Sequence, residues 1–455
     1  MRTDNATIVA DCNGVSRGLA ASRQGVRPSA RQRTVRSVAD PLLRHSVILG
    51  GGMALLNGAS WLFHVIMSRT LGPADYGALN ALIGLMLLLT VPANTLHMGV
   101  STLVARLWAA REVGAIRSTV AGMLRYVFGF GVVACAVLMA ASGLLAHALK
   151  LASPVPVVIA GTVLLGWTAL PLLRGVLQGM HRFAALGASL VAEGIVKLGI
   201  GVGLVMLGFA LNGAVVGISL GALGALLLTA AALRDRLQGP ALATSEIRDI
   251  ARHLAPYAVV IGCFTVLTQS DVVLVKALHD PVQAGIYAAA SAGGKTVLYV
   301  TAALPMIALP EAARRHELDQ DQRTALVRLL SIGALVGGAL VTGFFLFPLH
   351  VIRLLFGASY LPASPLLGYI GLGMLAYQLA TVTAYSQLAS GNLRVTKPLG
   401  ALAALFPVLV WVFRSNLIGV AVLIAVMGNL ALLTVWRQGA RERQRLEQSA
   451  DAASP

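Results

Sequence analysis

Long apolar segments, most of them about 20 residues or more and separated by short polar connections, run through almost the whole sequence. A helix of about 20 apolar residues is long enough to cross the hydrocarbon core of a bilayer. Because no water is available there, each segment must satisfy its own backbone hydrogen bonds, and runs of this length do not suit the short alternating strands of a barrel. Only 12% of the residues are charged, about half the share of a soluble chain. The pattern predicts an all-α polytopic membrane protein.

Hydropathy divides the segments into about 12 transmembrane helices. The expected spans are 46–68, 77–99, 121–148, 154–178, 184–209, 211–233, 254–278, 284–310, 325–350, 364–390, 394–414 and 416–436. Six lie on either side of a charged stretch, so we predict five parts. These are a basic disordered cytoplasmic tail (1–45), a six-helix bundle (46–233), a cytoplasmic linker (234–253), a second six-helix bundle (254–436) and a basic cytoplasmic tail (437–455).

Lysine and arginine are unevenly divided between the two sides of the membrane. With the N-terminus inside, 28 of the 35 Lys and Arg residues fall in cytoplasmic segments, five fall in outer loops, and Lys197 and Lys295 lie within spans. Membrane proteins carry such an excess on the cytoplasmic side, so we predict a multi-pass membrane protein with both termini in the cytoplasm. Basic loops facing anionic lipid headgroups explain the net charge of +17 without a nucleic-acid partner.

The two groups of six spans share landmarks at a constant offset. Gly77 follows the turn "SRTLGPADY", and Gly285 lies 208 residues later, in "VKALHDPVQAGIY". Arg106 and Arg314 are separated by the same 208 residues. Six spans per group give both groups one orientation, so we expect two parallel six-helix repeats, related by an axis along the membrane normal, around a central cavity.

The turn before Gly77 is interpreted mainly as a structural hairpin at the mouth of that cavity. Gly72 and Pro73 favour a tight turn, and Gly77 and Gly285 begin the next helices where backbones approach closely. Arg69 is the one member of the turn that we expect to face a ligand.

Several motifs keep their order along residues 42–436. They include "SRTLGPADYGALNAL", "AGIYAAASAGGK", "ALPEAARR" and "LFGASYLPASPLLGYIGLGMLAYQ". In these motifs the chain resembles the multidrug/oligosaccharidyl-lipid/polysaccharide (MOP) exporter superfamily, and within it the Wzx-type polysaccharide flippases. The resemblance implies a flippase of the bacterial inner membrane that moves a polyprenyl-pyrophosphate-linked oligosaccharide to the outer leaflet by alternating access, for surface or exopolysaccharide biosynthesis. The implied partners are this glycan, membrane lipids and other polysaccharide-assembly proteins.

Charged residues inside spans are the candidate site, because a charge near the bilayer centre is costly unless it is paired or faces water. Lys197 and Lys295 are expected to bind the pyrophosphate, one from each half. Glu193 and Asp271 are candidates for carrying a coupling proton. Glu193 and Lys197 are four residues apart, hence on one helix face, so they either pair with each other or line the cavity. Asp271 either faces the cavity or is neutralised by Lys276, whereas Lys295 has no nearby acid on its own face.

Other polar residues leave alternatives open. Arg174 borders the inner mouth and is a further substrate-binding candidate, although the excess of cytoplasmic charge also explains it. His64 lies at the position that the repeat matches to Asp271, and it is either a proton-coupling residue or a packing residue, as is His97. Five more residues are predicted to contact sugars, to lie in the interfacial belt or to tie helices together: Tyr287, Tyr377, Gln378, Tyr385 and Gln387.

Two other functions compete with the flippase. A proton- or cation-coupled exporter of small drugs would favour an acidic cavity, whereas the spans contain two lysines against Glu193 and Asp271. A membrane enzyme would need a catalytic motif, and "SAGGKT" (291–296) lacks the first glycine of a P-loop and lies within a span. We therefore predict no enzyme, no cofactor and no metal; the spacing of Cys12, Cys135 and Cys263 also suggests no zinc site.

Overall fold

The computed structural model describes residues 31–234, 244–302, 304–305, 322–389 and 392–453. Contacts divide the chain into Met1–Ile48 and Leu49–Pro455. Most of the predicted disordered tail lies outside the described residues, but helix α2 already begins at Arg31. All of the following concerns the second unit.

The N-terminal half consists of α2 to α8. Its elements are α2 (Arg31–Leu89), α3 (Val91–Ala109), α4 (Val113–Ala140), α5 (Ser142–Ala148), α6 (Val155–Gly179), α7 (Phe183–Leu204), the short π-helix η1 (Val205–Phe209) and α8 (Ala210–Ala232). α2 is two helices joined at Gly72, whose φ of 73° interrupts the helical path. Only glycine adopts this left-handed conformation without steric cost, which explains why the chain turns at this residue.

The C-terminal half consists of α9 to α16. Its elements are α9 (Thr244–Leu278), α10 (Pro281–Val300), α12 (Gln322–Leu346), α13 (Pro348–Leu355), η3 (Ala358–Ala363), α14 (Ser364–Ala389), η4 (Leu393–Val395), α15 (Thr396–Val412) and α16 (Leu417–Ala453). α9 includes residues 244–253, which the sequence assigned to the linker. Ile247, Ile250 and Leu254 continue the spacing of three to four that one helix face requires.

Among the described residues, nine segments are long and apolar enough to cross a membrane. Two of them, Leu49–Leu89 and Phe183–Ala232, each reverse direction, at Gly72 and at Gly208 respectively. The predicted span at 284–310 corresponds to the 20-residue helix α10, which is not one of these nine segments and carries Gln283, Ser291 and Lys295. The count of twelve spans stays a prediction.

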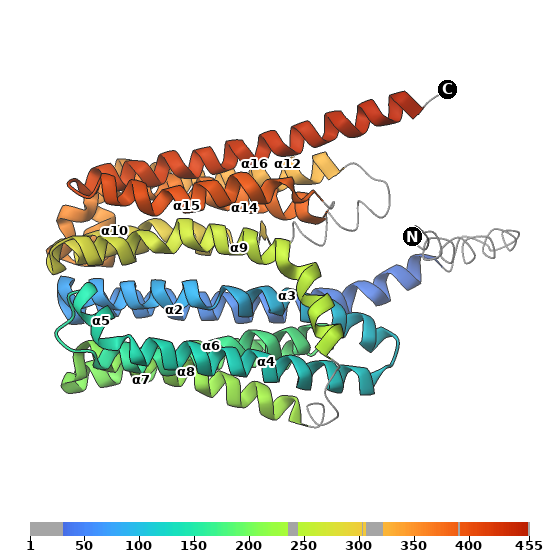
Figure 1. Cartoon of the computed structure of the whole chain (residues 1–455), viewed down its shortest axis with the longest axis horizontal. Coiled ribbons are helices and arrows are strands. Elements are labelled where there is room, and N and C mark those ends of the chain that lie inside the picture. The colour runs from blue at the N-terminus through green and yellow to red at the C-terminus, as the bar shows by residue number, and fades with distance from the viewer. Residues whose placement is uncertain (1–30, 235–243, 303, 306–321, 390–391, 454–455) are drawn as a thin grey trace, which may run out of the picture. The chain divides into compact units, whose positions relative to one another are not determined.

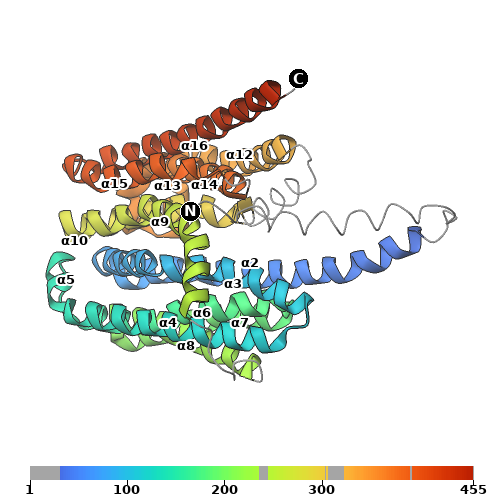
Figure 2. The ribbon, with the colours of Figure 1, turned by 45° about the vertical axis from the view of Figure 1, so that its right-hand side comes forward.

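The two halves lie side by side, with α2 to α8 on one side and α9 to α16 on the other (Figures 1 and 2). They meet most closely where Gly77 faces Gly285. A Cβ atom on Gly77 would lie 2.8 Å from the Gly285 nitrogen, and one on Gly285 would lie 1.7 Å from the Pro73 oxygen. The predicted close approach at these glycines is therefore confirmed.

Candidate functional site

Helices α9 and α10 share a polar cluster around a fully buried carboxylate. Asp271 has no exposed surface. The Tyr287 hydroxyl and the Ser291 hydroxyl each donate a hydrogen bond of 3.0 Å to its Oδ2 atom. Lys295 Nζ lies 3.6 Å from its Oδ1 atom and donates a hydrogen bond of 3.0 Å to Gln269 Oε1. Both oxygens of the acid thus have a polar neighbour on the next helix.

The spacing of these residues explains why they meet. Tyr287, Ser291 and Lys295 are four residues apart, so they form one stripe along α10. Asp271 comes from α9, which runs antiparallel to α10 across the short connection after Leu278. The spacing of the stripe was therefore visible in the sequence. Asp271, the acid that pairs with Lys295, lies on the preceding helix, on the other side of the loop between α9 and α10, and this contact was not visible in the sequence. Lys276 does not serve this acid, since its Nζ donates to the Ala74 oxygen at 3.3 Å.

Lys295 and Gln269 also line a narrow cavity between the two halves. The cavity is bounded by Trp61, His64, Val65, Asn80, Ile83, Leu87, Gln269, Val272, Ala292, Lys295, Tyr299 and Phe356. The cavity has a volume of about 30 Å³, which is enough for one or two water molecules. Polar groups from both halves face this space: His64 and Asn80 from α2, and Gln269 and Lys295 from α9 and α10.

An aromatic cluster closes the cavity toward the end of the bundle that contains Gly72, which we call the Gly72 end. Tyr76, Phe356 and Tyr360 are all buried, with ring centroids 5.8 to 6.2 Å apart, within the range of favourable aromatic contacts. Tyr76 comes from the N-terminal half, whereas Phe356 and Tyr360 follow α13. His64 lies beneath this cluster, with Nδ1 3.4 Å from the Tyr76 hydroxyl.

Four side chains cross between the halves at the Gly72 end and bond to backbone oxygens. Arg69 donates to the Leu354 oxygen, and Lys150 to the His279 oxygen at 2.7 Å. In the other direction, Lys276 reaches Ala74, as described above, and the Tyr360 hydroxyl donates to the Ser68 oxygen at 2.8 Å. Arg69, predicted to face a ligand, thus joins the halves and is not among the cavity residues.

In the N-terminal half, the candidate charges take other partners than expected. Arg174 pairs with Glu193 at 2.8 Å and also donates to the Ser189 hydroxyl and backbone oxygen, at 3.1 and 3.0 Å. Lys197 Nζ donates to Ser60 Oγ at 2.6 Å and lies 5.7 Å from the centre of the Phe63 ring. The expected alternative of a Glu193–Lys197 pair is replaced by an Arg174–Glu193 pair between α6 and α7.

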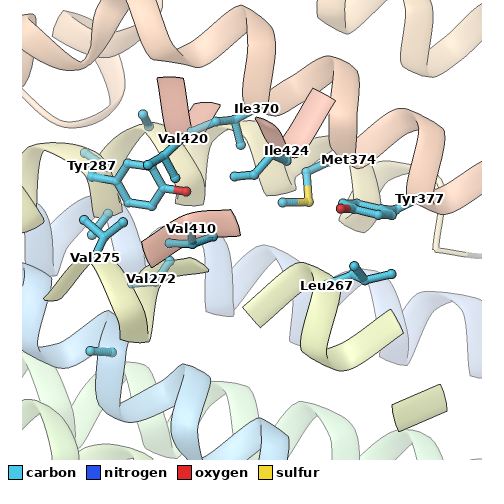
Figure 3. Packing of buried hydrophobic residues seen from close by; sticks show 14 of the residues in the cluster. Leu267, Val272, Val275, Tyr287, Ile370, Met374, Tyr377, Val410, Val420 and Ile424 are labelled. Carbon is cyan, nitrogen blue, oxygen red and sulfur yellow. The ribbon is translucent and has the colours of Figure 1, made fainter. Parts of the chain in front are cut away.

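The residues considered for sugar binding mostly lie within the helix packing. Gln378 donates to the Thr301 oxygen and Gln387 to the Val435 oxygen, both at 2.7 Å. Tyr287 and Tyr377 are buried in the core between α9, α10 and α14 (Figure 3). His97 is half-buried and is hydrogen-bonded to the Pro171 oxygen and to Gln178.

Trp61, Asn80 and Tyr299 line the cavity, and the sequence did not identify them. Their helices are apolar on nearly every face, so hydropathy does not indicate which side of each helix faces the cavity. Among the described residues, no group of three or more His, Cys, Asp and Glu side chains is arranged to hold a metal ion.

Comparison with known sequences and structures gives consistent matches. A family model described as "Polysaccharide biosynthesis protein" matches residues 66–365. An uncharacterized protein of Mycobacterium tuberculosis is 26% identical over 365 residues, covering 77% of this chain and 81% of its own.

Solved structures establish the fold. An inward-facing multidrug resistance MATE family transporter of the MOP superfamily superimposes with a TM-score of 0.66 at 16% identity, covering 89% of this chain and 96% of its own. A MOP superfamily transporter from Pyrococcus furiosus gives 0.57 at 17% identity, covering 88% and 96%, and its binding pocket is described as having reverse polarity, suggesting a different function. The predicted MOP fold is therefore confirmed.

Proposed function

Because this chain belongs to the polysaccharide biosynthesis protein family, we propose that it is a flippase for a polyprenyl-pyrophosphate-linked oligosaccharide. It is a multi-pass membrane transporter with the MOP fold. The proposed location is the bacterial inner membrane with both termini in the cytoplasm, which the excess of Lys and Arg on that side supports. The Gly72 end would then be the outer end.

The observation that carries the proposal is the ammonium group of Lys295 at the wall of the cavity between the halves. The other polar groups of this cavity are neutral amides, an imidazole and aromatic rings, and the nearest acid, Asp271, is fully buried behind Lys295. Lys295 is 7% exposed and Asp271 is not exposed at all, so the cation is the charged group that borders the cavity, and this favours an anionic headgroup. Amides and aromatic rings beside it suit the hydroxyls and apolar faces of sugars.

Asp271 is proposed to couple cargo binding to proton binding, because its ion pair with Lys295 would break when cargo binds the lysine. When a pyrophosphate binds Lys295, the ammonium group moves from the acid toward the cargo, and Asp271 keeps its bonds from Tyr287 and Ser291. A carboxylate left without its cation in the membrane is the group that would take up a coupling proton. Lys197 is proposed as the second cationic residue, with its ammonium group held by Ser60 until cargo enters.

The contacts at the Gly72 end support alternating access. Four bonds between the halves and a buried aromatic cluster lie on one side of the cavity, and their rupture would open it to that side. This conformation is accordingly assigned as closed to the outside.

A coupled exporter of small molecules is the second candidate, because two structural matches are described as multidrug resistance transporters. The cavity favours the flippase, since a cationic drug would meet Lys295 and would find Asp271 without exposed surface.

Deleting the gene in its host and analysing membrane lipids by mass spectrometry tests the proposal. We expect a completed lipid-linked repeat unit to accumulate and a surface or secreted polysaccharide to be lost. Complementation with Lys295→Ala or Lys197→Ala should fail, whereas Lys397→Ala, an exposed lysine on α15, should restore the polysaccharide. An intact polysaccharide without lipid accumulation, in a host with no second flippase, contradicts the flippase and favours the small-molecule exporter.

A further inference from the structure

Helices α12, α14 and α16 form a groove that shares no lining residue with the cavity described above. Val327, Ser331 and Ala334 of α12 form one wall, Leu379 of α14 contributes to the floor, and Leu432 and Trp436 of α16 form the other wall. The groove has a volume of about 400 Å³. The groove lies toward the end of the bundle opposite Gly72, since α12 begins there and α16 leaves the bundle there (Figure 1).

The shape of the groove follows from residue size. Ser331 and Ala334 are three residues apart on one face of α12, where larger residues would fill the space between α12 and α16. Apart from the Ser331 hydroxyl, the lining side chains are hydrocarbon or indole. Within a membrane this space is in contact with acyl chains, so a lipid chain is its natural occupant.

Two arginines give the groove a preference for one class of lipid. Arg328 of α12 follows the lining residue Val327, Arg437 of α16 follows the lining residue Trp436, and both arginines are exposed. Arginine near the membrane surface attracts anionic headgroups, and an indole ring commonly lies at the boundary between chains and headgroups. The charges and the apolar lining therefore match the two parts of one molecule.

We propose that this groove is a binding site for a resident anionic phospholipid, with an acyl chain between α12 and α16 and its phosphate near Arg328 and Arg437. The site is independent of the transport cavity and does not depend on the proposed cargo. The acyl chain would lie between α12 and α16 and would contact α14 at the floor of the groove.

Trp436 is a built-in reporter for the test. In a variant that keeps Trp436 and carries phenylalanine at the other four tryptophans, the fluorescence is measured in vesicles with bromine-labelled acyl chains. We expect phosphatidylglycerol to quench Trp436 more strongly than phosphatidylcholine at equal mole fraction, because each arginine near the headgroups contributes about fivefold in affinity. Replacing both arginines, Arg328→Gln and Arg437→Gln, should remove the preference.

Two controls separate a site from ordinary lipid contact. Ala334→Phe should reduce quenching by filling the groove, whereas Leu335→Phe, at the next position and 76% exposed, should leave it unchanged. A tryptophan placed at Leu335 in a chain without other tryptophans should be quenched equally by both lipids. Native mass spectrometry of the chain with all its tryptophans should show retained phosphatidylglycerol that is lost in the double arginine variant.

Three results would overturn the proposal. Equal quenching of Trp436 by the two lipids would mean ordinary boundary lipid. No quenching by either lipid would mean that protein covers the groove. Quenching by a brominated isoprenyl phosphate, with none by phosphatidylglycerol, would assign the groove to the transported lipid.

Discussion

Asp271 and Lys295 have unequal surroundings, although they form one ion pair. The carboxylate is fully buried and accepts from Tyr287 and Ser291, whereas the ammonium group borders the cavity and has Gln269 as its other partner. Removing the lysine would leave a buried negative charge with two neutral donors. Removing the acid would leave a cation beside a cavity that is large enough for water. The acid is therefore the partner that depends more on the pair for its stability.

We predict that Lys295→Met destabilises the protein by about 3 to 5 kcal/mol, the usual cost of leaving a buried charge without its partner. The double change Lys295→Met with Asp271→Asn should recover much of this loss, since no charge then remains. Thermal unfolding in detergent measures both. Arg394→Met is the matched control, because its pair with Glu442 at 2.7 Å is exposed on the arginine side and should contribute less than about 1 kcal/mol. An equal effect of Lys295→Met and Arg394→Met would contradict the prediction.

At the scale of elements, the two halves approach through hairpins that contain glycine. The α2 hairpin turns at Gly72, and the start of α10 packs against it through Gly285, with the Pro73 oxygen in the space where a side chain would be. The absence of a side chain permits backbone contact between the halves and brings the cavity residues of α2 and α10 within reach of each other.

Gly285→Ala should therefore separate the hairpins. A methyl group 1.7 Å from the Pro73 oxygen cannot be accommodated without movement of the backbone, and overpacking of this kind costs about 1 to 3 kcal/mol. Gly338→Ala on α12 is the control, since nothing lies within 4 Å of its added carbon and alanine favours a helix by about 1 kcal/mol. The midpoint of thermal unfolding should fall for the first variant and stay or rise for the second. A fall of equal size in both would contradict the close-approach argument.

The sequence predicted most elements because hydropathy and turn residues act locally. The span at 154–178 matches α6 within one residue at each end, and the span at 254–278 ends with α9 at Leu278, although α9 begins ten residues earlier, at Thr244. The repeated glycines identified the contact between the halves. Helix rotation was not predictable, because apolar residues surround nearly every span. The partners of Lys295 and Arg174 depend on that rotation and come from other helices, so the Arg174–Glu193 pair and the cavity residue Asn80 appear only in the structure.

At the scale of the whole molecule, the halves are held at the Gly72 end by side chains that donate to backbone oxygens. Three of the five basic residues expected in the outer loops, Arg69, Lys150 and Lys276, make these bonds. Basic residues are disfavoured on the outer side of a membrane protein, so their use here is consistent with a structural task. Each bond contributes modestly, which is compatible with the proposed alternating access, in which this closure would open and close.

Loosening this closure should expose the cavity from the outside. With Cys12, Cys135 and Cys263 replaced, Asn80→Cys supplies a single thiol at the cavity wall, and a membrane-impermeant thiol reagent is applied to right-side-out vesicles. Adding Arg69→Ala and Tyr360→Phe removes two bonds between the halves, about 1.4 kcal/mol together, so labelling should accelerate roughly tenfold. Arg353→Ala is the control and should leave the rate unchanged, because Arg353 is an exposed arginine on α13, the helix that contains Leu354, the partner of Arg69. Equal labelling rates with and without the two substitutions would mean that the aromatic packing of Tyr76, Phe356 and Tyr360 keeps this end closed without the bonds. Faster labelling in inside-out vesicles alone would contradict the assignment of the Gly72 end to the outer side.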